Sequence, residues 1–131
     1  MISKGGFEWD YQKEINLKIR LEWSKWFSWR EIESRDVDIP TLSGVYEVRT
    51  SDLRNCFDIG KAMNLRSRVL RGLVLGKKAH STGERMKKEG VNLDMLKVRW
   101  VKTKNPAALE EYLHNGHKKA FGHKPLYVRR T

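Results

Sequence analysis

Hydrophobic residues recur in three short stretches that are expected to be β-strands, at residues 45–49, 56–59 and 96–101, and in the third they alternate with polar ones. An alternation with a period of two residues predicts β-strands that have one buried face. The Ser51-Asp52 pair between the first two stretches is typical of a turn, so these two strands are expected to form a hairpin.

Helical signals follow the second predicted strand and the third one. Asn64 is a suitable cap for a helix that begins at Leu65. Asn105 followed by Pro106 predicts the start of a longer helix that runs to about Phe121, and a short helix is expected around residues 83–86. The order strand, strand, helix, helix, strand, helix predicts an α/β (α+β) sandwich. Its three-stranded, mainly antiparallel sheet is flanked by helices.

The first 37 residues form a tryptophan-rich extension, which we expect to pack on a core domain of residues 38–131. Residues 15–23 alternate as a half-buried strand would, although part of this segment also fits helical spacing, so its type stays open. Trp9, Trp23, Trp26 and Trp29 lie in the extension. Covering the sheet is the favoured role for these rings, and a stacking platform for bases is the alternative.

Positive charge is concentrated in the larger, C-terminal part of the chain. Residues 1–40 have a net charge of −1 and residues 41–131 a net charge of +12, which together give the +11 of the whole chain. Such a surplus is typical of proteins that bind a polyanion and release its counterions. Nucleic acid is therefore the favoured partner, with an anionic lipid surface or simple solubility as alternatives.

The lone cysteine and the lack of long apolar runs indicate an intracellular protein. Cys56 can form no internal disulfide and lies in an apolar stretch, as expected of a buried thiol in a reducing compartment. We see no secretory signal and no membrane-spanning run.

Five short motifs occur in a defined order along residues 38–128. They are Gly44-Val45-Tyr46, Asp58-Ile59-Gly60-Lys61, Asn64-Leu65-Arg66-Ser67-Arg68, His80-Ser81 and Ala108-Leu109-Glu110-Glu111-Tyr112-Leu113. In this order, and on predicted elements of the right type, they resemble the GIY-YIG nuclease family.

The resemblance implies a DNA endonuclease that depends on a divalent cation, Mg²⁺ or Mn²⁺. Glu110 stands at the position of the family's metal ligand, and Glu111 is its rival if the register is shifted by one. Tyr46 would position or deprotonate the attacking water. Lys61 and Arg68 would neutralise charge on the phosphate, and His80 would hold a phosphate or carry a proton.

Asp58 stands where the family has its second signature tyrosine. An ionised carboxylate repels a phosphate, by about 3 kcal/mol at an effective dielectric of about 20 and a separation of about 5 Å. Two arrangements would offset this cost. Asp58 either shares the cation with Glu110, which makes it a second metal ligand and a catalytic residue, or pairs with Lys61 or Arg68 and leaves a domain that binds nucleic acid without cutting it. The asparagine that the family usually has near its end is also absent here.

The partners expected from these features are DNA, with RNA not excluded, and no membrane. The basic residues predicted to contact nucleic acid are Lys61, Arg66, Arg71, Lys77, Lys78 and Arg85. The extension also leaves room for a protein partner or a homodimer. Glu110, His114 and His117 share one stripe of the last helix, as zinc ligands can, but no second group of ligands matches them and we do not expect zinc.

Overall fold

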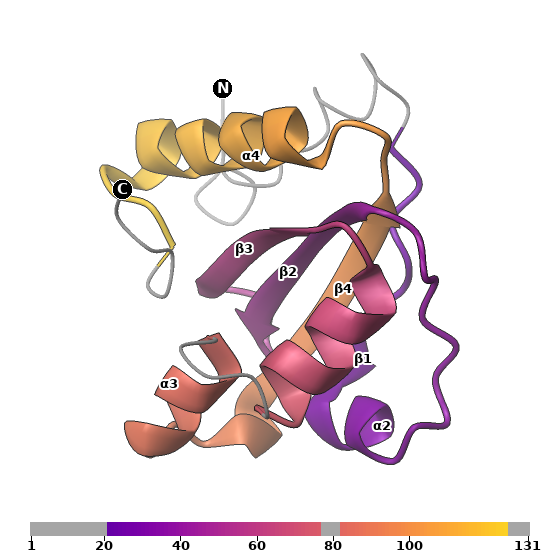
Figure 1. The fold of residues 1–131 in the computed structure, drawn as a ribbon. Coiled ribbons are helices and arrows are strands. Elements are labelled where there is room, and N and C mark those ends of the chain that lie inside the picture. Colours follow the sequence, from indigo (N-terminus) through magenta and orange to yellow (C-terminus); the bar gives the residue numbers. More distant parts are fainter. Residues whose placement is uncertain (1–20, 77–81, 126–131) are drawn as a thin grey trace.

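The computed structural model describes residues 21–76 and 82–125 as a mixed α and β domain with helices on both faces of one sheet (Figure 1). The elements in chain order are β1 (Phe27–Ser28), α2 (Trp29–Glu33), β2 (Gly44–Thr50), β3 (Cys56–Ala62), η2 (Ser67–Val74), α3 (Thr82–Lys88), η3 (Leu93–Met95), β4 (Leu96–Lys102) and α4 (Pro106–Phe121).

Within the described residues the sheet has four antiparallel strands in the order β1-β4-β2-β3, where three were expected. The three predicted strands are confirmed as β2, β3 and β4. The additional strand, β1, pairs Phe27 with Val98 and Ser28 with Lys97. Two residues are too few to show an alternating pattern, which is why sequence reasoning missed this strand. Strand β3 lies at the other edge, a position that matters for the site below.

The helix ends follow the predicted caps in most respects. The Asn64 side-chain oxygen accepts a hydrogen bond from the Ser67 N–H at 3.0 Å, which is the predicted capping contact. Beyond this cap the chain forms the π-helix η2, which the sequence did not indicate. In α4, Pro106 occupies the first turn and Gly122 ends the helix in the left-handed conformation, with φ of 82°. Asn105 occupies the N-cap position, but its side chain makes no capping hydrogen bond.

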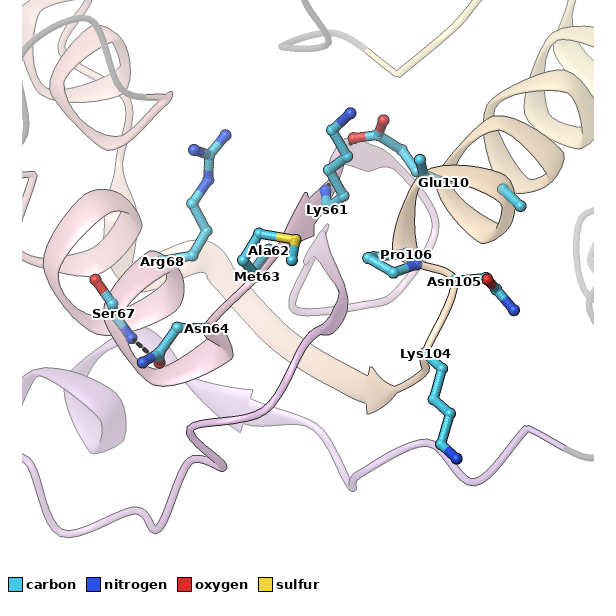
Figure 2. Close-up of a pocket in the computed structure, with 12 residues that line it drawn as sticks. Lys61, Ala62, Met63, Asn64, Ser67, Arg68, Lys104, Asn105, Pro106 and Glu110 are labelled. Carbon is cyan, nitrogen blue, oxygen red and sulfur yellow. Dashed lines mark hydrogen bonds between the residues drawn. The ribbon is translucent and has the colours of Figure 1, made fainter.

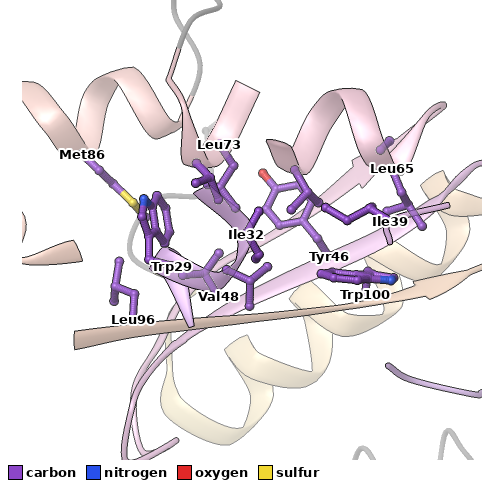
Figure 3. Packing of buried hydrophobic residues seen from close by; sticks show 14 residues of the cluster. Trp29, Ile32, Ile39, Tyr46, Val48, Leu65, Leu73, Met86, Leu96 and Trp100 are labelled. Atoms are coloured by element: carbon purple, nitrogen blue, oxygen red, sulfur yellow. The ribbon is translucent and has the colours of Figure 1, made fainter. Parts of the chain in front are cut away.

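Each face of the sheet carries its own hydrophobic cluster, because alternate residues of each strand point to opposite sides. On one face, β2 and β4 side chains pack with residues of α2, η2 and α3, and Tyr46 and Trp100 lie in this cluster (Figure 3). On the other face, Val45, Ile59 and Val101 pack against Leu109 and Leu113 of α4. The predicted sandwich is therefore correct, and among the described helices only α4 covers this second face (Figure 1).

The described part of the N-terminal segment packs on the sheet without the strand expected at residues 15–23. Residues 21–26 form no strand, and residues 15–20 lie outside the described residues. Instead, Ser24 bonds to Trp100 through its backbone N–H at 2.8 Å and its hydroxyl at 3.0 Å. Trp29 is buried in the core. Trp23 and Trp26 instead cover the guanidinium of Arg99, whose central carbon lies 4.0 and 4.6 Å from their ring centroids.

No helix within residues 21–76 and 82–125 combines the length and the apolar character needed to cross a bilayer.

Candidate active-site groove

An open groove of about 790 Å³ lies between the turn that follows β3 and the start of α4 (Figure 2). Charged side chains from three different elements line it: Lys61 from β3, Arg68 from η2 and Glu110 from α4. Lys61 and Arg68 are exposed, and Glu110 is half-buried. The structure therefore brings together three of the residues that the sequence singled out, although they are up to 49 positions apart.

Helix α4 is joined to the outer edge of β3 in the described sheet by two side chains one helical turn apart. The Glu110 carboxylate accepts a hydrogen bond from the backbone N–H of Lys61 at 2.8 Å. His114 Nε2 donates to the Ile59 carbonyl at 2.6 Å. An edge strand presents backbone groups without partners, and these two contacts satisfy one N–H and one C=O of β3. They also fix the position of Glu110 in the groove.

The groove can hold a divalent cation through Glu110. Among the described residues, the hydrogen bond from Lys61 occupies only one oxygen of this carboxylate, so the other oxygen can face a cation. Residues 21–76 and 82–125 contain no group of three or more His, Cys, Asp or Glu side chains placed to surround a metal. One carboxylate, with waters as most of the remaining ligands, suits Mg²⁺ and not a closed zinc site.

Tyr46 and Asp58 form a buried pair on the face of the sheet that η2 covers. Their exposed fractions are 1% and 3%, and the Tyr46 hydroxyl donates to Asp58 Oδ2 at 2.8 Å. Neither residue is among those that line the groove. The geometry therefore gives no support to a cation shared between Asp58 and Glu110, because the Asp58 carboxylate is enclosed and already accepts a hydrogen bond.

Arg68 connects this buried pair to the groove. Its guanidinium hydrogen-bonds to the phenol oxygen of Tyr46 and lies close enough to Asp58 to favour the ionised carboxylate. Of the two arrangements considered for Asp58, pairing with Arg68 is thus the one that the geometry favours. Arg68 also lines the groove. It therefore contacts the buried Tyr46–Asp58 pair and borders the open groove at the same time.

Burial raises the pKa of both members of the pair. Desolvation raises the pKa of the Tyr46 phenol, and the negative charge of Asp58 raises it further, while Arg68 opposes this shift. Desolvation also raises the pKa of Asp58, against hydrogen bonds from Tyr46 and from the Thr82 hydroxyl. A phenol with a raised pKa keeps its proton at neutral pH, so the buried Tyr46 is suited to holding Arg68 and poorly suited to deprotonating water.

Close packing explains two glycines of the first motifs. A β-carbon at Gly60 would lie 2.5 Å from the ring of Tyr46, which crosses directly over this residue. At Gly44 it would lie 2.2 Å from the Val101 carbonyl oxygen and 2.7 Å from the Leu65 side chain. Gly60 thus allows the Tyr46 ring to approach β3, and Gly44 allows the Leu65 side chain to approach β2. Tyr46 contacts Arg68, and Leu65 lies next to the turn that lines the groove.

The other predicted residues occupy varied positions. Arg66 and Arg71 are exposed on the helix of Arg68 and Arg85 is half-exposed on α3, but none of the three lines the groove. His80, Lys77 and Lys78 lie outside the described residues. His117 is buried and its Nδ1 bonds to the His123 carbonyl at 2.6 Å, a contact that ties down the end of α4.

Sequence reasoning missed the part that Thr82 and Lys104 have in this region. Thr82 bonds to Asp58 from the start of α3, and Lys104 lines the groove just before α4. The position of Lys104 beside the Asn105-Pro106 helix start was a signal that could have placed it near Glu110. No signal in the sequence linked Thr82 to a residue 24 positions earlier.

Comparisons with known proteins give similarity at the level of structure. No protein-family model matches the sequence, and no curated protein matches it. Three crystal structures of the GIY-YIG N-terminal endonuclease domain of UvrC from Thermotoga maritima, all point mutants bound to the catalytic divalent cation, are 25–26% identical to this chain. Each alignment covers 76% of this chain and 97% of the other, with a TM-score of 0.48.

Proposed function

We propose that this protein is an endonuclease that hydrolyses DNA phosphodiester bonds with a divalent cation, Mg²⁺ or Mn²⁺. The observation that carries the proposal is the meeting of Lys61, Arg68 and Glu110 in one open groove. Two cations and a carboxylate at the same place can bind a phosphate and a metal ion together. The ordered sequence motifs that resemble the GIY-YIG family support the same conclusion.

The bound cation would neutralise charge on the phosphate and lower the pKa of a coordinated water. Glu110 would hold it, with its carboxylate oriented by the Lys61 N–H. The ammonium group of Lys61 and the guanidinium of Arg68 would bind phosphate oxygens and stabilise the negative charge that develops there as water attacks. Fixed charges of this kind are effective because they need no reorganisation during the reaction.

Tyr46 and Asp58 act in this proposal as positioning residues. The phenol oxygen holds the Arg68 guanidinium, and Asp58 fixes the phenol by accepting a 2.8 Å hydrogen bond from its hydroxyl. The enclosed Asp58 carboxylate does not line the groove, and the nearby Arg68 charge would further reduce its repulsion of the substrate. His80 remains a prediction, as do contacts of Lys77, Lys78, Arg66, Arg71 and Arg85 with DNA.

A plasmid-nicking assay with and without Mg²⁺ tests the proposal. Glu110→Gln keeps an oxygen that can accept from the Lys61 N–H but removes the charge that binds metal. We expect it to lower nicking at least about a hundredfold while DNA binding and unfolding temperature stay unchanged. Glu111→Gln, at the exposed neighbouring position, is the matched control and should nick normally. Equal nicking by Glu110→Gln and the parent protein would remove Glu110 from the mechanism.

A second candidate function is nucleic-acid binding without cleavage. The observation that favours it is the Asp58 carboxylate, which holds the Tyr46 hydroxyl in a buried hydrogen bond. This function predicts binding that weakens with salt and is indifferent to EDTA, and no cleavage in Mg²⁺ or Mn²⁺. The same assay, read together with a binding measurement, separates the two functions.

A further inference from the structure

Met63 is the most exposed large hydrophobic side chain of the described residues, with 81% of its surface accessible. It lies in the turn between β3 and η2, two residues after Lys61, and it lines the groove. In Figure 2 it stands between Arg68 and Pro106. A methionine in water is unremarkable by itself, but this one is surrounded by the charged residues of the candidate site.

The backbone around Met63 is held firmly. The N–H of Leu65 donates to the Leu42 carbonyl and that of Arg66 to the Pro40 carbonyl, both at 2.9 Å. Asn64 caps the following helix through Ser67. The turn therefore presents an apolar tip at a fixed place. Leu42, with 57% of its surface accessible, adds a second apolar residue on the chain segment bonded to this turn.

The groove combines this tip with positive charge and a small apolar wall. Lys61, Arg68 and Lys104 supply the charge, and Pro106, Ala107 and Ala108 supply the wall at the start of α4. A ligand that matches this surface has anionic groups at its edges and an apolar surface between them. A nucleic-acid strand has this chemistry, since its phosphates lie outside the flat faces of its bases. Inorganic phosphate would use only the cations.

We propose that Met63 enters the base stack of bound DNA beside the phosphate held by Lys61 and Arg68. Methionine is among the residues that proteins insert between base steps, where it partly unstacks and bends the duplex. Unstacking costs least at a step that is already weakened. The domain would therefore prefer duplexes that contain a mismatch or a bulge over fully paired ones. This inference rests on the proposed function, because it deepens the substrate choice of the same groove.

The test uses the full chain carrying Glu110→Gln, so that DNA stays intact, and a duplex with 2-aminopurine beside a central mismatch. Binding should raise the fluorescence, and the mismatched duplex should bind at least about fivefold more tightly than the matched one. Met63→Ala should abolish both effects, and Met63→Leu, which keeps an apolar side chain of similar size, should retain them. Met95→Ala is the matched control, because Met95 is 54% exposed at the opposite end of β4.

Retention of the fluorescence change and the mismatch preference by Met63→Ala would overturn the proposal, as would an equal loss in Met95→Ala. Failure of the proposed function is a separate result, since it would show as absence of Mg²⁺-dependent nicking by the parent chain. The fluorescence measurement needs no cleavage and therefore remains decisive in that case. A parent chain that binds matched and mismatched duplexes equally would also overturn the proposal.

Discussion

The sheet buries two carboxylates on opposite faces, those of Glu47 and Asp58. They differ in the charge and the exposure of the groups that they contact. Glu47, on the α4 side, is fully buried between two arginines. One of its oxygens accepts from Arg49 Nε at 2.7 Å, and the other accepts from Arg99 Nε and Nη2 at 2.8 Å. Asp58, on the η2 side, is held by the neutral hydroxyls of Tyr46 and Thr82, with the Arg68 guanidinium nearby.

The cations of the two clusters also differ. Arg49 is 5% exposed, and burial lowers its pKa to about 10, so it remains charged at neutral pH. Arg99 is covered by Trp23 and Trp26. The Arg49 and Arg99 side chains both bond to Glu47 and pack against the sheet. Arg68, in contrast, is exposed and lines the groove, so its charge is accessible from outside the core. The Glu47 carboxylate, whose arginine partners are enclosed, supports the fold. The Asp58 carboxylate lies near an arginine that also lines the groove, an arrangement suited to a binding site.

The largest effect is expected from Glu47→Gln. This change removes the buried negative charge that the guanidinium groups of Arg49 and Arg99 both contact, and breaking a buried ion pair in this way costs about 3–5 kcal/mol. Urea unfolding should show the loss. The exposed Arg30–Asp94 pair, joined at 2.9 Å, offers a control, because Asp94→Asn should change stability far less. A similar small effect for both variants would contradict a structural role for the Glu47 cluster.

A smaller effect is expected from Arg68→Lys, and it should appear in activity and not in stability. Lysine keeps the positive charge but lacks the planar guanidinium, whose several N–H groups can contact the Tyr46 phenol and face the groove at the same time. We expect nicking to fall about tenfold, equivalent to about 1.4 kcal/mol of transition-state stabilisation. Arg54→Lys, in the exposed β2–β3 hairpin, should nick normally. Full activity in Arg68→Lys would mean that only charge matters at this position.

Thr82→Val tests whether the neutral donors matter for Asp58. The variant keeps the shape of the side chain but removes a hydroxyl that bonds to a buried carboxylate, so we expect a loss of about 1 kcal/mol at neutral pH. The loss of a hydrogen bond that favours ionisation should also raise the pKa of Asp58 further. Thr82→Ser, which keeps the hydroxyl, should restore most of both properties. Carboxyl carbon NMR titration and urea unfolding measure them.

The smallest change in folding stability at neutral pH is expected from Asp58→Asn. This variant is informative because it should alter how stability depends on pH. Because burial raises the pKa of Asp58 in the folded protein, the folded state binds more protons than the unfolded state between the two pKa values. Stability must therefore fall as pH rises from about 4, near the unfolded pKa of Asp, through the folded pKa. Asp58→Asn should lack this component. Parallel stability curves for the two proteins between pH 3 and 8 would refute the assignment.

Several features of the site followed from the order of residues in the chain. The strands expected at residues 45–49 and 56–59, joined by the Ser51-Asp52 turn, placed Tyr46 and Asp58 on paired strands, and the cap at Asn64 placed Arg68 one turn into a helix. Periodicity and capping are local properties, so they predicted β2, β3, β4 and α4 with bounds that differ by a few residues. The short strand β1 and the π-helix η2 carry no comparable local pattern and were missed.

The sequence by itself determined which side chains are available: a basic chain, a carboxylate near the start of the last helix, and an aspartate at the position where the GIY-YIG family has its second tyrosine. Only the tertiary structure decided their environments. It placed Glu110 against the edge of β3, enclosed Asp58 beneath η2 and left Met63 in the groove. The physical reason is that burial and contacts between distant elements set the charge state and reach of a side chain, and neither is encoded in residues close to it in the sequence.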